Sequence, residues 1–323
     1  MTKHYDVTAL GEVLIDFTEN GSSAQGNPMY EANPGGAPCN VLAMLQKFGH
    51  KTAFLGKVGE DIFGRRLEIV LKEAGIDTAG LCMDPTVRTT LAFVEKKADG
   101  DRDFSFYRNP GADMMLRAEE LREQILKDTR IFHFGTLSMT DEPVRSATRH
   151  AIETAKANGA LLSFDPNIRE PLWQSMEEAK RQTAYGMEVC DVLKISDNEI
   201  RWFTGEKDFD RGVDKLWREY HIPLILLSMG SGGSRAYCGS RRAEQPAFLQ
   251  EGTIETTGAG DTFGACCLHY ILEHGVAGLG TPELEEMLRF ANAAASIVTT
   301  RRGALRVMPE PEEIQALLAE KSI

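Results

Sequence analysis

Residues 161–195 read LLSFDPNIREPLWQSMEEAKRQTAYGMEVCDVLKI, in which two short apolar runs flank a longer amphipathic run. The apolar runs, Leu161–Phe164 and Val192–Ile195, have the length and composition of buried strands. The intervening Met176–Cys190 is typical of a helix. Strands joined through a helix form a parallel pair, because the crossover must return the chain to the same end of the sheet. The stretch therefore predicts one βαβ unit.

The same alternation continues on both sides of this unit. Further strands are predicted at Val7–Leu10, Ala53–Leu55, Ile131–Phe134 and Leu224–Ser228, and further helices at Ala37–Phe48, Phe63–Ala74, Val144–Asn158 and Phe209–Tyr220. This pattern favours one mostly parallel sheet with helices on both faces. We therefore expect a single α/β domain over residues 1–323, with its site at the carboxyl ends of the strands.

Two segments, at about 17–33 and 87–110, interrupt the alternation. The first is polar and glycine-rich, and the second contains the strand-like runs Thr89–Val94 and Asp103–Tyr107 around an Asp99-Gly100 pair. Asp-Gly between two such runs is a strong hairpin signal. We interpret the two segments as a small antiparallel sheet that forms a lid, with a surface hairpin of no particular role as the alternative.

Composition narrows the classes of partner. The 323 residues are 42% hydrophobic and 26% charged, and the net charge of −12 comes without a basic stripe, which argues against nucleic acid. We expect no signal peptide at Met1–Leu10 and no membrane segment, because the densest apolar stretch, Ile222–Leu227, is too short to cross a bilayer. Six cysteines without CxxC spacing favour reduced thiols in the cytoplasm, and seven scattered histidines show no zinc pattern.

The segment Glu255-Thr-Thr-Gly-Ala-Gly-Asp261 carries the strongest functional signal. Its small residues leave the backbone bare before a predicted helix at Asp261–His274, and amides at such a helix start can bind phosphate. Asp261 next to an anion site is a candidate general base. The alternative is an ordinary glycine-rich loop with Asp261 as a helix N-cap. Neither a P-loop motif nor a complete dinucleotide fingerprint occurs in the sequence.

Polar residues also follow several of the predicted strands. Asp16 suits a pair of neighbouring sugar hydroxyls, and Gly35-Gly36 followed by Asn40 offers bare backbone and then an amide. Asp165, Asn167 and Arg169 follow one strand, the cluster from Lys194 to Glu199 follows the next, and the small-residue turn from Ser228 to Gly233 follows a third. Each cluster has a structural alternative, such as a tight turn or a solvent contact. Their shared position after strands favours one common site.

Two of these motifs together match a family signature. Gly35-Gly36-x-x-x-Asn40 followed by Gly56-x-Val58-Gly59-x-Asp61-x-x-Gly64 resembles the N-terminal signature of the ribokinase-like (PfkB) carbohydrate kinases, and residues 255–261 resemble their C-terminal signature. The stretches at 11–17, 34–40, 132–138 and 163–169 are most similar to those of bacterial fructokinases. The resemblance covers essentially the whole chain and implies a ribokinase-like three-layer αβα fold with a small β-sheet lid.

The resemblance also implies an activity and a set of roles. The activity is ATP-dependent phosphorylation of a primary hydroxyl, fructose to fructose 6-phosphate. For catalysis the resemblance implies Asp261 as the base, an anion hole at Gly258, Ala259 and Gly260, and Arg169 as a charge-stabilising contact. The implied sugar-binding residues are Asp16, Gly35, Gly36 and Asn40. The implied ATP-binding residues are Lys194, Ser228, Gly230, Gly232 and Asn292, and Glu199 is implied as a contact to Mg²⁺ through water. A monovalent cation such as K⁺ is expected at Glu255 and Thr257, although Glu255 stands where the family has Asp.

Other readings remain open at this stage. Phe104, Phe106 and Arg108 are candidate lid contacts to the substrate, and Arg108 with Arg169 would suit a carboxylate-bearing sugar such as 2-keto-3-deoxygluconate. Ribose is a further candidate substrate. A family member without catalysis that senses sugar or binds a partner is a third reading, which the intact Asp261 disfavours. A homodimer through the lid is expected, because an exposed sheet face is commonly covered by a second copy.

Overall fold

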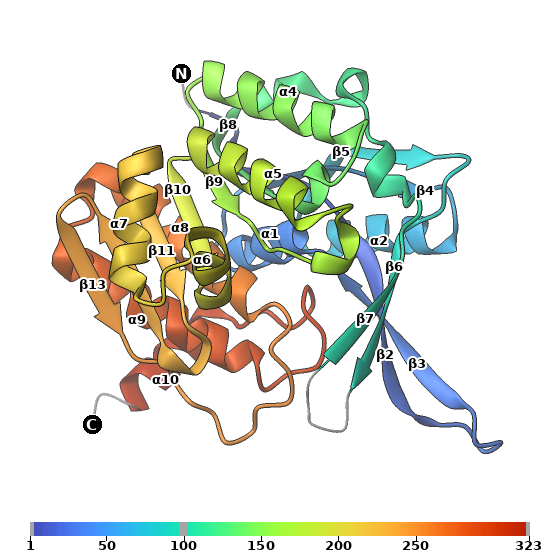
Figure 1. Ribbon diagram of the computed structural model, residues 1–323. Helices are drawn as coiled ribbons and strands as arrows, with labels where there is room; N and C mark the ends of the chain where they lie inside the picture. The colour runs from blue at the N-terminus through green and yellow to red at the C-terminus, as the bar shows by residue number, and fades with distance from the viewer. Residues whose placement is uncertain (1–2, 97–101, 321–323) are drawn as a thin grey trace.

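The computed structural model describes residues 3–96 and 102–320 and confirms the three-layer α/β/α fold (Figure 1). In the described residues a nine-stranded sheet has the order β13-β12-β11-β10-β9-β8-β1-β4-β5, and a four-stranded sheet has the order β3-β2-β6-β7. Strands β11 to β5 of the large sheet run parallel, and β12 and β13 are added antiparallel at one edge.

The strands of the large sheet are β1 (Tyr5–Leu10), β4 (Thr52–Gly59), β5 (Asp77–Asp84), β8 (Thr129–Gly135), β9 (Leu161–Asp165), β10 (Val192–Ser196), β11 (Leu224–Ser228), β12 (Ser234–Cys238) and β13 (Arg241–Gln245). Those of the small sheet are β2 (Leu14–Ser22), β3 (Pro28–Gly35), β6 (Leu91–Lys96) and β7 (Arg102–Tyr107). The small sheet projects away from the large one, as Figure 1 shows.

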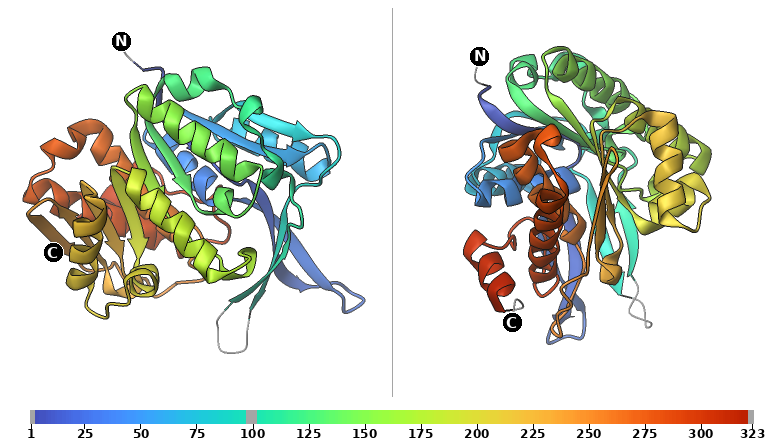
Figure 2. Two further views of the ribbon diagram at one scale, coloured as in Figure 1. Left: turned by 45° about the horizontal axis from the view of Figure 1, so that its top comes forward. Right: turned by 90° about the vertical axis from the view of Figure 1, so that its left-hand side faces the viewer.

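Helices cover both faces of the large sheet, as its edge-on view shows (Figure 2). One face packs against α1 (Ala37–Lys47), α2 (Ile62–Glu73), α8 (Ala259–Gly278), α9 (Thr281–Val298) and α10 (Pro311–Glu320). The other packs against α3 (Glu123–Lys127), α4 (Val144–Ala157), α5 (Met176–Val189), α6 (Asp197–Thr204) and α7 (Phe209–Tyr220). Short 3₁₀ turns lie at Ala112–Met115, Ala118–Glu120, Leu137–Met139, Glu170–Leu172 and Gly230–Gly232. No helix in the described ranges combines the length and apolar character needed to cross a membrane.

The predicted helices and parallel strands form close to their expected boundaries, because buried apolar runs mark them. The predicted lid differs in one respect: β2 and β3 pair antiparallel and so do β6 and β7, but β2 and β6 pair parallel. The prediction of a purely antiparallel lid was therefore wrong. The expected turn at Lys97–Gly100 lies outside the described residues.

The second half of the N-terminal signature anchors the lid to the large sheet. The Asp61 carboxylate caps α2 by accepting hydrogen bonds from the N–H groups of Phe63 (3.0 Å) and Gly64 (2.8 Å). It also accepts from the N–H (2.9 Å) and Oγ1 (2.8 Å) of Thr89, which precedes β6. A Cβ at Gly64 would lie 1.9 Å from the Gly59 carbonyl oxygen, and one at Gly59 would lie 2.6 Å from the Thr89 nitrogen, so both positions need glycine. The signature thus joins α2 to the entrance of the lid.

We predict that Asp61→Ala lowers the free energy of unfolding by about 2 kcal/mol, because a helix cap is lost and the buried Thr89 N–H is left unpaired. Desolvation raises the pKa of Asp61, but its hydrogen bonds, those of Thr89 first, outweigh it and hold the pKa below the usual range. The contribution is therefore present at neutral pH and lost as the pH falls below about 4.

Urea unfolding at pH 7 and at about pH 2 measures both effects. Asp208→Ala, which removes an exposed cap from α7, is the control and should cost less. Equal losses for the two variants would contradict the anchoring role.

Candidate active site

The N-termini of α1 and α8 meet at the carboxyl ends of the parallel strands. Asn40 in the first turn of α1 is buried, and its Nδ2 donates a 2.7 Å hydrogen bond to Oδ2 of Asp261 in the first turn of α8. Asn40 Oδ1 is buried and has no hydrogen-bond partner within the described chain, so it is available to a ligand. The two signatures, 221 residues apart, therefore form one corner.

The backbone before Asp261 has the geometry of an anion site. Gly258 caps α8 at φ 78°, a left-handed conformation that favours glycine. Ala259 N–H donates to Thr256 O (3.2 Å) and Thr262 N–H to Gly258 O (2.8 Å), whereas the amides of Gly260 and Asp261 have no backbone acceptor in the described part of the chain. These amides at the positive end of a helix dipole suit a phosphate oxygen.

Asp261 itself is placed for proton transfer. Burial raises the pKa of this half-buried carboxyl, while the Asn40 hydrogen bond and the charges of Lys194 and Arg169 act in the opposite direction. A carboxylate whose pKa lies above its ordinary value is a better proton acceptor near neutral pH.

Asp16 lies at the root of the lid against the first glycine pair. A Cβ on Gly35 would lie 2.4 Å from Asp16 Oδ2, which is why a side chain cannot stand there. Burial raises the pKa of Asp16 to about 7, with Arg169 lowering it and Glu255 raising it. Asp16, Arg169, Glu255 and the glycine loop therefore share one neighbourhood.

Lys194 lies beneath the anion site. Its Nζ forms an ion pair with Asp165 Oδ2 at 2.9 Å, and a Cβ on Gly260 would lie 3.1 Å from that nitrogen. Burial lowers the pKa of Lys194, but Asp165, Glu199 and Asp261 outweigh it and keep the ammonium charged. Burial raises the pKa of Asp165 to about 6, so the pair is ionised at neutral pH.

The sequence places Asp165 with Asn167 and Arg169 in the predicted common site but predicts no individual role for it. Its Oδ1 is buried and has no partner among the described residues. Asp165 is the last residue of β9, and its ion-pair partner Lys194 lies on the neighbouring strand β10. An unpaired carboxylate oxygen at such depth is suited to a cation.

Glu199 connects two polar segments that follow neighbouring strands. Its Oε2 accepts from the N–H (2.9 Å) and Oγ (2.6 Å) of Ser196, which forms a capping box at the start of α6. Its Oε1 accepts from Ile168 N–H at 2.9 Å, next to Arg169. Ser196 thus serves as a helix cap and leaves Glu199 fixed at the strand ends.

The segment before α8 is held by the segment after α9. The N–H groups of Ile254 and Glu255 donate to Thr299 O, and the buried Glu255 accepts from Gly303 N–H at 3.2 Å through Oε1. Thr257 is half-buried in the same segment. The structure therefore places both residues expected to bind a cation beside the anion site.

The residues expected to bind the nucleotide divide into two groups. Ser228, Gly230 and Gly232 form an open turn after β11, in which Gly230 has φ 54°. Asn292 is instead buried: its Oδ1 accepts from Ser234 Oγ (2.9 Å), and its Nδ2 donates to the carbonyls of Gln245 (3.2 Å) and Pro246 (3.0 Å). Its amide is occupied in joining α9 to the end of β13.

Arg108 differs most from its expected role. Its Nε donates to Asp113 Oδ2 at 2.7 Å, Nη1 to Thr140 Oγ1 at 3.0 Å and Nη2 to Leu137 O at 2.8 Å, so the guanidinium is buried and directed into the protein. The expected substrate contact through Arg108 stays a prediction, and these three bonds hold its guanidinium inside the protein. Phe106 is half-buried and pairs with Ala92, and the side chain of Phe104 is outside the described atoms.

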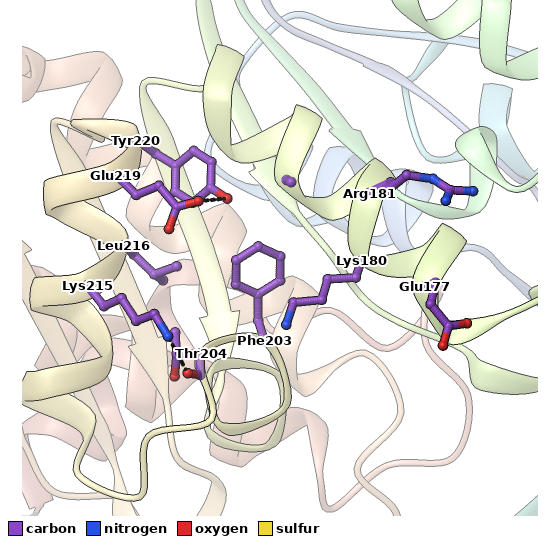
Figure 3. A pocket seen from close by; sticks show the side chains of 10 residues that line it. Glu177, Lys180, Arg181, Phe203, Thr204, Lys215, Leu216, Glu219 and Tyr220 are labelled. Atoms are coloured by element: carbon purple, nitrogen blue, oxygen red, sulfur yellow. Dashed lines mark hydrogen bonds between the residues drawn. The ribbon is translucent and has the colours of Figure 1, made fainter.

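A cavity of about 420 Å³ lies away from this corner, between α5, α6 and α7 (Figure 3). Phe203 forms its apolar wall, Lys180 Nζ lies 5.4 Å from the Phe203 ring centre, and Lys215 is held by Thr204 O. These helices cover the opposite face of the sheet from α1 and α8, so the cavity is separate from the site.

The described residues contain no cluster of three His, Cys, Asp or Glu suited to hold a metal by themselves.

Comparison with known proteins agrees with this geometry. The profile of the "pfkB family carbohydrate kinase" matches residues 5–311. A probable fructokinase-4 from Arabidopsis thaliana is 41% identical over 97% of this chain and 96% of its own. The crystal structure of a fructokinase with bound ATP from Xylella fastidiosa is 31% identical, with a TM-score of 0.89 over 98% of this chain and 99% of that one. A fructokinase double mutant from Vibrio cholerae in fructose-, ADP- and potassium-bound form is 26% identical, with a TM-score of 0.86 over 98% and 99%.

We predict that the carboxyl of Asp16 titrates near pH 7 in the ligand-free protein. Glu255→Gln should move the midpoint to lower pH and Arg169→Ala to higher pH, because the first removes a negative and the second a positive neighbour. The folded state then binds this proton more tightly than the unfolded chain, so the stability that it contributes falls as pH rises from about 4 to 7.

Carbon-13 NMR of aspartate-labelled protein measures the midpoint. Asp16→Asn assigns the resonance. A midpoint below pH 5, or one that neither substitution moves, would contradict the assigned neighbourhood.

Proposed function

Since the chain belongs to the pfkB family of carbohydrate kinases, we propose that it transfers the γ-phosphoryl group of ATP to the primary hydroxyl of fructose, giving fructose 6-phosphate. The sugar-kinase activity follows from the family. The choice of fructose is supported by relatives named fructokinase that match over nearly the whole chain.

The observation that carries the catalytic assignment is the 2.7 Å hydrogen bond between Asn40 and Asp261. It places a carboxylate of raised pKa beside bare backbone on both helices. We assign Asp261 as the base that removes the hydroxyl proton. The resulting alkoxide oxygen attacks the γ-phosphorus in line as the bond to the β-phosphate oxygen breaks.

Charge on the transferred group is offset by donors already in place. Of the amides expected to form the anion hole, that of Ala259 already donates to Thr256 O, so we assign the role to the neighbouring amides of Gly260 and Asp261. Lys194 lies next to Gly260, and the charge of Arg169 acts on Asp261. Such preorganised donors do not need to reorient during the reaction. The lid that carries Asp16 would exclude water, which would otherwise compete for the phosphoryl group.

The environment of Arg108 bears on the choice of sugar. A carboxylate-bearing substrate such as 2-keto-3-deoxygluconate would need a free cation near the lid. Arg108 is committed to Asp113 inside the protein, so among the described residues assigned to the site Arg169 is the remaining candidate arginine. The neutral hydroxyls of fructose instead match Asp16, the amides of the glycine pair and the free Oδ1 of Asn40.

We assign the open turn of Ser228, Gly230 and Gly232 to the nucleotide. Its glycines let a ribose or phosphate approach the main chain closely. Asn292 supports this region from behind by holding Gln245 and Pro246, rather than contacting the base through its amide.

Two cations complete the proposal. Mg²⁺ fits Asp165 and Glu199, because Asp165 has a buried oxygen without a protein partner, and the ion would neutralise charge on the phosphates of ATP. A monovalent cation such as K⁺ fits the segment of Glu255 and Thr257, where the Glu255 carboxylate is buried and accepts a hydrogen bond from Gly303 N–H. Glu255 would keep this segment, and with it the anion site, in place.

The lid also suits a homodimer. Its face away from Asp16 carries an aromatic cluster in which Phe93 stacks on Phe17 at 4.8 Å and contacts Tyr30 and Tyr107. Tyr107 is 66% exposed and Tyr30 46%. A second copy of the same face would cover these rings, as expected of a two-fold interface.

The cysteines support a reducing, cytoplasmic setting. All six are free, and five of them are buried. Burial raises the pKa of the thiols of Cys39 and Cys266 well above the usual value, which disfavours the reactive thiolate.

We predict that Asp261→Asn lowers kcat by about 10²–10⁴-fold, because the base is removed while the side-chain shape is kept. The Asn oxygen can still accept from Asn40 Nδ2, so fructose and ATP should bind within about threefold of the wild-type affinity. Coupled ATP-turnover assays and calorimetry measure the two quantities. Asp208→Asn, on the remote α7, should leave turnover unchanged.

The substrate assignment is checked in the same assay with fructose, ribose and 2-keto-3-deoxygluconate. Turnover should be highest with fructose, require Mg²⁺ and increase with K⁺. Preference for the keto-deoxy acid would overturn the fructose assignment. Sugar binding without ATP consumption would overturn the assignment of catalysis.

We predict that Tyr30→Glu with Tyr107→Glu converts the protein to a monomer, because four carboxylates would face one another in a dimer that joins through this face. Sedimentation velocity measures the state. Trp217→Glu, at an aromatic residue of similar exposure on α7, is the control and should remain dimeric. A wild-type protein that sediments as a monomer at micromolar concentration would refute the interface.

A further inference from the structure

Helix α1 begins without a cap of its own. Gly36 occupies the N-cap position at φ 124° and has no side chain to accept a hydrogen bond from the first amides of the helix. Helices with such a start usually rely on an Asp, Asn, Ser or Thr at that position. Here glycine is required, because a Cβ on Gly36 would lie 2.4 Å from the carbonyl oxygen of Glu12.

Glu12 supplies the missing cap from the turn between β1 and β2. Its Oε1 accepts a 3.0 Å hydrogen bond from Ala37 N–H, although the two residues are 25 positions apart. The side chain is only 6% exposed, so this is an internal contact. A carboxylate here also interacts favourably with the positive end of the helix dipole.

The other groups that face Glu12 are already committed. Burial raises the pKa of Glu12 to about 7, with the hydrogen bond from Ala37 and the charge of Arg108 lowering it and Asp113 raising it. Arg108 and Asp113 form their own buried ion pair. Cys39, in the first turn of α1, is buried beside it. Glu12 is thus directed at the start of α1 and not at the solvent-facing part of the corner.

We infer that Glu12 is a positioning residue for the sugar: its carboxylate holds the glycine loop and the first turn of α1, and through them the Asn40 amide, in the binding geometry. This deepens the proposed function and rests on it. Residues 35–40 carry three of the assigned sugar contacts, and Glu12 is the side chain that ties their start to the end of β1.

Three variants separate hydrogen bonding from charge. Glu12→Gln keeps an acceptor oxygen at the same reach, Glu12→Asp keeps the charge but is one methylene too short, and Glu12→Ala removes both. We expect Ala and Asp to raise the fructose KM about fivefold to tenfold with less than a twofold change in the ATP KM, and Gln to remain near wild type. Ser175→Ala removes the cap of the remote α5 and should change neither constant.

A second measurement does not depend on the identity of the sugar. Hydrogen exchange over residues 35–40 of the free protein should be faster in Glu12→Ala and Glu12→Asp and unchanged in Glu12→Gln. Equal exchange in all variants, or ATP and sugar constants that rise together, would overturn the inference. Absence of wild-type turnover with fructose would instead refute the proposed function and leave the exchange result to decide the role of Glu12.

Discussion

The hydrogen bond between Asn40 and Asp261 joins the starts of two helices that lie side by side on one face of the sheet. Each helix start brings its own glycine turn, so this single contact determines where bare backbone from both halves of the chain converges. The bond also moderates the raised pKa of Asp261, because an amide donor stabilises the ionised carboxylate that burial disfavours. Position and proton affinity of the candidate base therefore depend on the same pair.

The corner around this pair holds more negative than positive side chains, although ATP, which we propose binds there, is an anion. Its carboxylates are Asp16, Asp165, Glu199, Glu255 and Asp261, and its cations are Lys194 and Arg169. Backbone amides at the start of α8 compensate locally, because they present partial positive charge without adding a side chain. Burial is the main cause of the raised pKa values of Asp16 and Asp165, and the neighbouring carboxylates raise them further.

The two faces of the lid carry different sets of side chains, because side chains alternate between the faces along each strand. In the row that pairs Asn33, Asp16, Ala92 and Phe106, side chains lie on the same face as Asp16. The next row places Phe17 and Phe93 on the opposite face, where Tyr107 joins them. One sheet can therefore serve a small ligand and a second protein copy, because successive residues point to opposite sides.

Local patterns in the sequence predicted the alternation of helices and parallel strands, the position of the glycine turns and Asp261 as the candidate base. They could do so because apolar periodicity and runs of small residues are properties of neighbouring residues. The edge strand β5 escaped prediction, since it is mixed in polarity and only partly buried. The parallel pairing of β2 with β6, the commitment of Arg108 to Asp113 and the occupied amide of Asn292 were decided by the tertiary structure. So were the unpaired oxygen of Asp165 and the cap that Glu12 provides. Each of these features depends on which groups come into contact in the folded protein. The type of a side chain shows which hydrogen bonds it can form, but its partner is known only from the tertiary structure.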